Sequence, residues 1–172
     1  RYHSDHDALS NCFNRRTVIE ALERLQARHG GAARCAVVLL DIDHFKSIND
    51  RHGHLVGDRV ITEVAALLGR GLDRATPLFR YGGEEFAILL RDAPLAQGVA
   101  LAERLRAAQA AGDLNGLRVT VSIGVAEWRA AEGSIDHALA RADRALYAAK
   151  AAGRNRVVAD DAPAPASPPE TV

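Results

Sequence analysis

Apolar and polar positions along this chain follow two patterns, one typical of helices and one typical of strands. Residues 36–40 form a continuous apolar run, the pattern of a strand buried on both faces, whereas residues 117–127 alternate apolar and polar positions. Pro94 lies near the start of one helical pattern and Gly153 stops another. The patterns predict helices over 14–28, 44–51, 58–70, 94–110 and 134–152, a hairpin over 76–91, and strands over 34–42, 117–127 and 156–158.

The order of these elements predicts an α/β (α+β) fold with a central mixed β-sheet flanked by helices. The chain has 172 residues, 48% of them hydrophobic, so it can bury a sizeable core in one domain. The segment from residue 160 onward is rich in Ala and Pro and is predicted to be disordered, because it offers nothing to bury.

Charge and cysteine content narrow the classes of partner. The formal net charge is zero, so no long-range field recruits nucleic acid or an anionic membrane. No apolar stretch is long enough to span a bilayer, and no signal peptide is visible. Cys12 and Cys35 are too few for a disulfide framework and are expected to be reduced and buried in a cytosolic protein. The chain lacks methionine even at position 1, so we expect it to be a piece of a longer or processed protein.

Two glycines and two carboxylates lie in the middle of the predicted hairpin. Gly82 and Gly83 are predicted to form a two-residue turn, which favours residues that tolerate positive φ. A turn without Cβ atoms also lets a ligand approach the backbone, which makes both glycines candidate substrate-binding residues. Glu84 and Glu85 would then open the next strand and point to opposite faces. Taken alone, a solvated hairpin tip explains this segment equally well.

A second group of carboxylates follows the buried apolar run. Asp41 and Asp43 come directly after residues 36–40. A buried strand that ends in carboxylates resembles the palm of nucleotide polymerases and cyclases, where such a group meets another on a neighbouring hairpin and the pair holds Mg²⁺. Asp41 and Glu84 are candidates for that pair, because Mg²⁺ takes one or two protein carboxylates together with substrate phosphates.

The chain resembles a GGDEF domain, the catalytic module of diguanylate cyclases, in the GGEEF spelling. The resemblance covers roughly residues 5–158, in order and with sensible spacing. The segments that carry it are 7–16, 41–58, 80–86, 120–126 and 142–155.

The resemblance implies a diguanylate cyclase that condenses two GTP molecules into cyclic di-GMP and releases two pyrophosphates. Each domain would supply one GTP, so two domains must face each other as a homodimer. It divides the chain into an N-terminal linker and opening motif (1–13), the catalytic domain (14–159) and a disordered tail (160–172). It further implies the bacterial cytoplasm, either in a soluble protein or in the cytoplasmic part of a membrane-bound sensor, with an upstream sensory or dimerisation domain removed. Direct contact with nucleic acid or membrane is not expected.

The resemblance assigns catalysis to Glu84 and Lys46. Two Mg²⁺ or Mn²⁺ ions per GTP site, about 4 Å apart, would serve the attacking and leaving oxygens. Asp41, the backbone carbonyl of Ile42 and Glu84 would bind them, with Glu85 as a further ligand. Glu84 is also the candidate base for the 3′-hydroxyl, although metal ligation and base chemistry compete for the same lone pairs.

Guanine selection is assigned to Asn49 and Asp58, with His54 as a supporting contact. A carboxylate accepts hydrogen bonds from guanine N1 and N2, whereas adenine presents an acceptor at N1. Taken alone, an aspartate at position 58 is more often only a helix cap and a histidine at position 54 more often a solvated side chain. His44, His52 and His54 suggest zinc, but no Cys or suitably spaced fourth ligand accompanies them, and we reject that interpretation.

Triphosphate binding is assigned to Lys46, Lys150 and Arg154. Only two of the 22 basic residues are lysines, and they are Lys46 and Lys150. A compact ammonium serves as a point charge where a planar guanidinium does not fit. Alternatively, Lys150 is a cation favoured near a helix C-terminus. Backbone N–H groups around His44 and Phe45, at the start of a short helix, are further candidates.

Two departures from the family pattern are visible. Ser10–Cys12 replaces the usual Thr-Gly-Leu, a mild change. The product-inhibition motif RxxD usually begins nine residues before the first hairpin glycine, which here gives Asp73 and Thr76. Arg70 and Asp73 do spell RxxD, but three residues too early. We therefore expect weak or absent product inhibition, unless a loop of different length restores the site.

Two other classes of function compete with the cyclase. A binding module of the same fold would hold GTP or cyclic di-GMP and signal by conformation. Degenerate modules of this kind usually lose a metal carboxylate or a hairpin glycine, and this chain has lost neither. A purely structural dimerisation domain leaves Asp41, Glu84, Asn49 and Asp58 unexplained. A mixed purine specificity is disfavoured by the carboxylate of Asp58.

Overall fold

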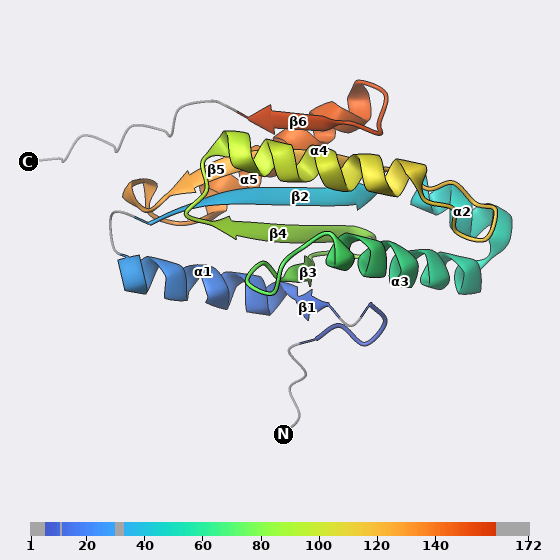
Figure 1. The fold of residues 1–172 in the computed structure, drawn as a ribbon, viewed down its shortest axis with the longest axis horizontal. Coiled ribbons are helices and arrows are strands. Elements are labelled where there is room, and N and C mark those ends of the chain that lie inside the picture. The colour runs from blue at the N-terminus through green and yellow to red at the C-terminus, as the bar shows by residue number, and fades with distance from the viewer. Residues whose placement is uncertain (1–5, 11, 30–32, 161–172) are drawn as a thin grey trace, which may run out of the picture.

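The computed structural model describes residues 6–10, 12–29 and 33–160 (Figure 1). Helices and strands alternate along most of this length. In chain order they are β1 (Phe13–Asn14), α1 (Arg15–His29), β2 (Arg34–Ile42), α2 (Phe45–His52), α3 (His54–Arg70), β3 (Leu78–Arg80), β4 (Glu85–Arg91), α4 (Leu95–Ala111), β5 (Val121–Arg129), a 3₁₀ helix (Ala130–Glu132), α5 (Asp136–Ala151) and β6 (Val157–Asp160).

The strands form one mixed sheet in the order β1-β3-β4-β2-β5-β6. β2 lies inside the sheet and pairs antiparallel with β4 and β5, while β1–β3 and β5–β6 are parallel pairs. Every residue of β2 except Arg34 is buried, as the continuous apolar run predicts. The mixed sheet flanked by helices confirms the predicted fold class.

Helices cover both faces of the sheet (Figure 1). Val38 and Leu40 of β2 pack in one core with side chains of α3 and α4. Val37 and Leu39 point to the opposite face and pack with side chains of α1 and α5. This alternation follows from the two-residue period of a strand, and it fixes the direction in which the end of β2 presents its polar residues.

Close packing of α5 on the sheet depends on Gly124 of β5. A Cβ atom at this position would lie 2.2 Å from the Ala142 carbonyl oxygen and 2.3 Å from the Leu146 nitrogen. Only glycine therefore lets the helix backbone approach the strand this closely. The same approach brings the C-terminal end of α5 next to the end of β2.

Most predicted elements agree with the observed ones to within two residues, and two boundaries differ more. α3 begins at His54, where Gly53 with φ 86° ends the preceding helix, so Asp58 does not cap α3 as one interpretation proposed. β5 begins at Val121 rather than at residue 117, because Leu114 and Leu117 pair with each other in a tight turn.

Two short elements and the boundary of the C-terminal tail also differ from the prediction. The two-residue strand β1 and the 3₁₀ helix were not predicted. Asp160 belongs to β6, so the predicted tail begins one residue too early, and residues 161–172 lie outside the described part. No helix within the described residues is both long and apolar enough to cross a membrane.

Candidate active site

The candidate residues of β2 and of the hairpin meet at one end of the sheet. Asp41 lies opposite Glu85 of β4 and opposite Ser122 of β5 in the strand register. The backbone N–H of Ile42 donates a hydrogen bond to the carbonyl oxygen of Glu84, at 3.1 Å. The structure therefore places the predicted metal-binding residues beside one another.

The hairpin turn differs from the prediction in length and conformation. The Tyr81 N–H donates to the Glu85 carbonyl at 2.8 Å, so the turn contains three residues, and Glu84 lies in the turn rather than in the strand. Neither glycine has a positive φ. A Cβ at Gly82 would lie 2.9 Å from Glu85 Oε2, whereas one at Gly83 would meet nothing within 4 Å. The atom closest to a Cβ at Gly82 is the end of a flexible side chain and a Cβ at Gly83 would meet open space, so packing within the domain requires neither glycine.

Arg80 holds this wider turn closed. Its Nη2 donates to the Gly83 carbonyl at 2.7 Å, and its Nε lies 3.2 Å from the Gly82 carbonyl oxygen. Its Nη1 forms an ion pair with Asp7 at 2.8 Å. Burial alone would raise the pKa of Asp7, but hydrogen bonds from Ser10 and Arg80 lower it. Asp7, near the start of the chain, therefore helps to stabilise the hairpin turn through its ion pair with Arg80.

Asp41 carries a buried carboxylate and is only 4% exposed. Burial above all raises its pKa, Lys150 opposes the shift, and the neighbouring Glu84 and Glu85 add to it, so that the pKa lies at about 6. Lys150 Nζ from the end of α5 donates a hydrogen bond to Asp41 Oδ2. The cation predicted to meet phosphate thus already faces the predicted metal ligand.

The donor set at this end of the sheet fits a hard cation that shares its ligands with phosphate. No group of three or more His, Cys, Asp or Glu side chains suited to a metal is found among the described residues. The oxygens available are those of Asp41, Glu84, Glu85 and the Ile42 carbonyl. Mg²⁺ typically takes one or two carboxylates and completes its shell with substrate phosphates and water, so this set suffices.

Asn49 of α2 points toward α3 with an unsatisfied oxygen. Its Oδ1 is buried and has no hydrogen-bond partner within the described residues. A Cβ at Gly57 would lie 1.8 Å from this oxygen, so only a glycine here lets Asn49 keep its amide in this position. A buried acceptor without a donor is costly, and a ligand that brings an N–H group would satisfy it. His54 and Asp58 lie exposed on the first turns of α3.

The start of α2 presents backbone N–H groups beside the end of β2. His44 precedes the helix with φ 57°, and Phe45 is its first residue. The first N–H groups of a helix lack partners within the helix, and no acidic residue occupies the first turn. Lys46 is exposed on this turn. The arrangement suits an anion, as predicted from the sequence.

The turn after α5 lies against the end of β2. Gly153, Arg154 and Asn155 all have positive φ, of 125°, 65° and 46°. The Asn155 N–H donates to Asp43 Oδ2 at 3.0 Å. Sequence reasoning assigned no role to Asp43; its place two residues beyond Asp41 was the available signal. Arg154, predicted to bind phosphate, is half-buried on this turn.

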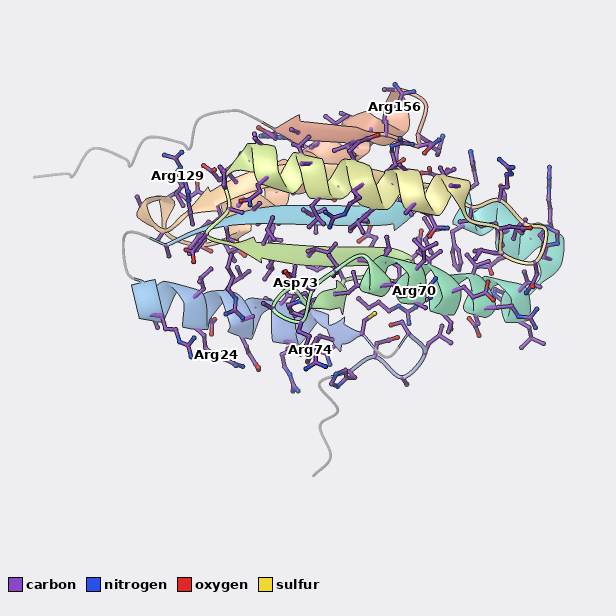
Figure 2. The ribbon with its side chains drawn as sticks, viewed as in Figure 1. Arg24, Arg70, Asp73, Arg74, Arg129 and Arg156 are labelled. Atoms are coloured by element: carbon purple, nitrogen blue, oxygen red, sulfur yellow. The ribbon has the colours of Figure 1, made fainter. Side chains whose placement is uncertain are left out.

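The aspartate of the displaced RxxD motif forms hydrogen bonds within its own loop. Asp73 Oδ1 accepts hydrogen bonds from Ala75 N at 3.0 Å and from Thr76 Oγ1 at 2.9 Å. Arg70 is the last residue of α3, and Asp73 lies on the loop that leads to β3 (Figure 2). The Asp73 carboxylate thus stabilises a turn.

Comparison with known proteins identifies related sequences and structures. A family model described as "Diguanylate cyclase, GGDEF domain" matches residues 4–156. The diguanylate cyclase DgcM of Escherichia coli K12 is 44% identical over 156 residues, covering 90% of this chain and 38% of that protein. The diguanylate cyclase DgcP of Pseudomonas aeruginosa is 42% identical over 156 residues, covering 88% of this chain and 23% of that protein. The chain thus spans well under half the length of these two relatives.

A solved structure agrees with the fold over most of the chain. The GGDEF domain of DgcB from Caulobacter crescentus, crystallised in complex with c-di-GMP, superposes with a TM-score of 0.85 at 36% identity. The match covers 92% of this chain and 97% of that domain. The two chains therefore share their architecture from end to end of the domain.

Proposed function

This chain belongs to the diguanylate cyclase GGDEF-domain family, and we propose that it condenses two GTP molecules into cyclic di-GMP with release of two pyrophosphates. One observation carries the proposal. The buried carboxylate of Asp41, the turn residue Glu84 and the cation of Lys150 converge where β2 ends. Phosphoryl transfer asks a protein mainly for positioning and charge neutralisation, and these groups supply both.

Divalent cations, Mg²⁺ or Mn²⁺, would be held by Asp41, the Ile42 carbonyl, Glu84 and Glu85. When bound, they neutralise charge on the phosphates and activate the 3′-hydroxyl. Glu84, whose carboxylate lies at the turn, would accept the proton of that hydroxyl. Lys150 keeps the buried charge of Asp41 compensated and lies where a phosphate oxygen would meet it.

Guanine would be read by Asn49 and Asp58. The unsatisfied Oδ1 of Asn49 is a ready acceptor for a guanine N–H. The exposed carboxylate of Asp58, on the helix that also carries Gly57, would accept from the Watson–Crick edge, and His54 would support the nucleotide. Adenine would leave these acceptors unpaired, which is the strong form of discrimination.

The triphosphate would lie between the start of α2 and the end of α5. Backbone N–H groups after His44, together with Lys46, line one side. Lys150 and Arg154 line the other, and Gly83 permits close approach at the hairpin. Because each domain would hold a single GTP, two domains must face each other to close the cyclic product.

Product chromatography tests the reaction directly. Incubating the protein with GTP and Mg²⁺ over a range of protein concentrations is expected to yield cyclic di-GMP, with a rate that rises more steeply than linearly with protein. The steep dependence follows because two domains must associate for each turnover. GTP binding by calorimetry without any product would contradict the cyclase and favour a nucleotide-sensing module.

We further propose that product inhibition through the RxxD site is weak or absent. Asp73 spends its Oδ1 on two hydrogen bonds within its own turn, and Thr76 occupies the expected acidic position. Arg70→Ala is therefore expected to leave the response of the rate to added cyclic di-GMP unchanged. Arg74→Ala, on the exposed loop beside it, is the matched control. Loss of inhibition in the Arg70 variant alone would show that the displaced pair binds product.

A further inference from the structure

Asp43 has a buried carboxylate with three hydrogen-bond donors around it. The residue is 5% exposed. Its Oδ1 accepts from Ser122 Oγ at 2.6 Å, and its Oδ2 accepts from Thr120 Oγ1 at 2.6 Å and from the Asn155 N–H at 3.0 Å. Its own N–H donates to the Thr120 carbonyl at 2.9 Å. Since a carboxylate offers about four lone-pair sites, little capacity is left for a cation.

These donors come from two segments that are distant in sequence from β2. Thr120 directly precedes β5 and Ser122 is its second residue, while Asn155 lies in the turn between α5 and β6. That turn has left-handed backbone at Arg154 and Asn155, which non-glycine residues adopt only where their surroundings hold them. The bond from Asn155 to Asp43 is such a restraint, and the Arg154 N–H adds a second by donating to the Ala149 carbonyl at 3.0 Å.

The restrained turn determines where Arg154 lies and adjoins the end of α5, which carries Lys150. Arg154 is part of the turn, and Lys150 lies in the last turn of α5, with its Nζ on Asp41. Arg156, which follows the turn and donates from its Nε to the Arg154 carbonyl at 3.0 Å, lies at the same end of the molecule as the end of β2 (Figure 2). A shift of this turn would therefore move Arg154 relative to Asp41 and would disturb the end of α5 that carries Lys150.

We propose that Asp43 is a positioning residue for the triphosphate of GTP and not a ligand of the divalent cations. The inference rests on the proposed function, because it assigns Lys150 and Arg154 to phosphate. Asp43 fixes the turn that carries Arg154 and adjoins the end of α5 with Lys150, so that both cations face the phosphates bound beside Asp41. In the Asp-Ile-Asp segment, Asp41 would thus bind the divalent cations, and Asp43 would hold the turn after α5.

The test measures substrate affinity and cation requirement separately. Asp43→Ala is expected to raise the KM for GTP, and the Kd for a non-hydrolysable GTP analogue, by about tenfold, because a charge-assisted hydrogen bond that holds the turn is lost. The Mg²⁺ concentration for half-maximal rate at saturating GTP should stay unchanged. Asp41→Asn is expected to raise that Mg²⁺ concentration instead.

Milder variants keep the proposal testable if the alanine variant fails to fold. Ser122→Ala and Thr120→Val each remove one donor to Asp43, and both should raise the Kd of the analogue by a smaller factor. Asp43→Asn keeps an acceptor for the Asn155 N–H and should restore part of the affinity lost in the alanine variant. Asp113→Ala is the matched control, since Asp113 Oδ1 accepts from Gly116 N at 2.6 Å in another left-handed turn.

The outcomes separate this inference from the proposed function. If the wild-type protein binds no GTP analogue by calorimetry, the proposed function fails and the role of Asp43 fails with it. If the wild type binds, and the folded Asp43 and Ser122 variants bind equally well with only lower melting temperatures, the residue is merely structural and the inference is overturned. A raised Mg²⁺ requirement in Asp43→Ala, equal to that in Asp41→Asn, would overturn it as well.

Discussion

Glu84→Gln is expected to lower the rate of cyclic di-GMP formation by about a thousandfold or more while leaving the fold intact. The bond that places this residue runs from the Ile42 N–H to the Glu84 carbonyl, and it does not involve the side chain. The amide keeps the size of the side chain but removes its charge, so both cation binding and proton acceptance are lost. Product chromatography gives the rate, and a melting curve of the same sample reports the fold.

Variants of two further glutamates serve as comparisons for Glu84→Gln. Glu20→Gln makes the same chemical change on α1, where the carboxylate lies 3.7 Å from Arg16 and 3.8 Å from Arg24, and should leave the rate unchanged. Glu85→Gln should give a smaller loss than Glu84→Gln, because Glu85 is the additional ligand and its carboxylate also lies against Gly82. Full activity in the Glu84 variant would remove this residue from the chemistry.

The parts of the fold predicted well are those with a strong local pattern. β2 spans residues 34–42 as expected, because a continuous apolar run bounded by polar residues has few other solutions. The two-residue strand β1 is too short to show a period, so it was not predicted. The start of α3 was predicted four residues too late. Gly53, with φ 86°, separates α2 from α3 immediately before His54, and no capping side chain marks this boundary in the sequence.

The parts of the site that escaped prediction depend on contacts between distant residues. Arg80 closes the hairpin turn through the carbonyls of both glycines while paired with Asp7, and no local rule for turns contains that ion pair. Asp43 likewise acquires its role from Thr120 and from the turn after α5. The family motifs identified candidate ligands, but they did not predict the hydrogen bonds that orient these side chains.

Gly57→Ala is expected to weaken GTP binding by about ten- to a hundredfold and to reduce the preference for GTP over ATP. The new Cβ would lie 1.8 Å from Asn49 Oδ1 and 3.4 Å from Phe45 Cζ. The Asn49 amide is the free end of its side chain, so it can rotate away. Its oxygen then leaves the position from which it would accept a guanine N–H. Calorimetric titration with non-hydrolysable analogues of GTP and ATP measures both effects.

The same helix provides a control that separates recognition from stability. A Cβ at Gly69 of α3 would meet nothing within 4 Å, so Gly69→Ala should raise the melting temperature, through about 1 kcal/mol of helix propensity, and leave GTP affinity unchanged. Gly57→Ala gains the same propensity, which offsets the displacement of Asn49, so its stability should change little. An affinity loss confined to position 57 would then come from the moved Asn49. Equal GTP affinity in both variants would mean that Asn49 does not read the base, and guanine selection would have to rest on Asp58 alone.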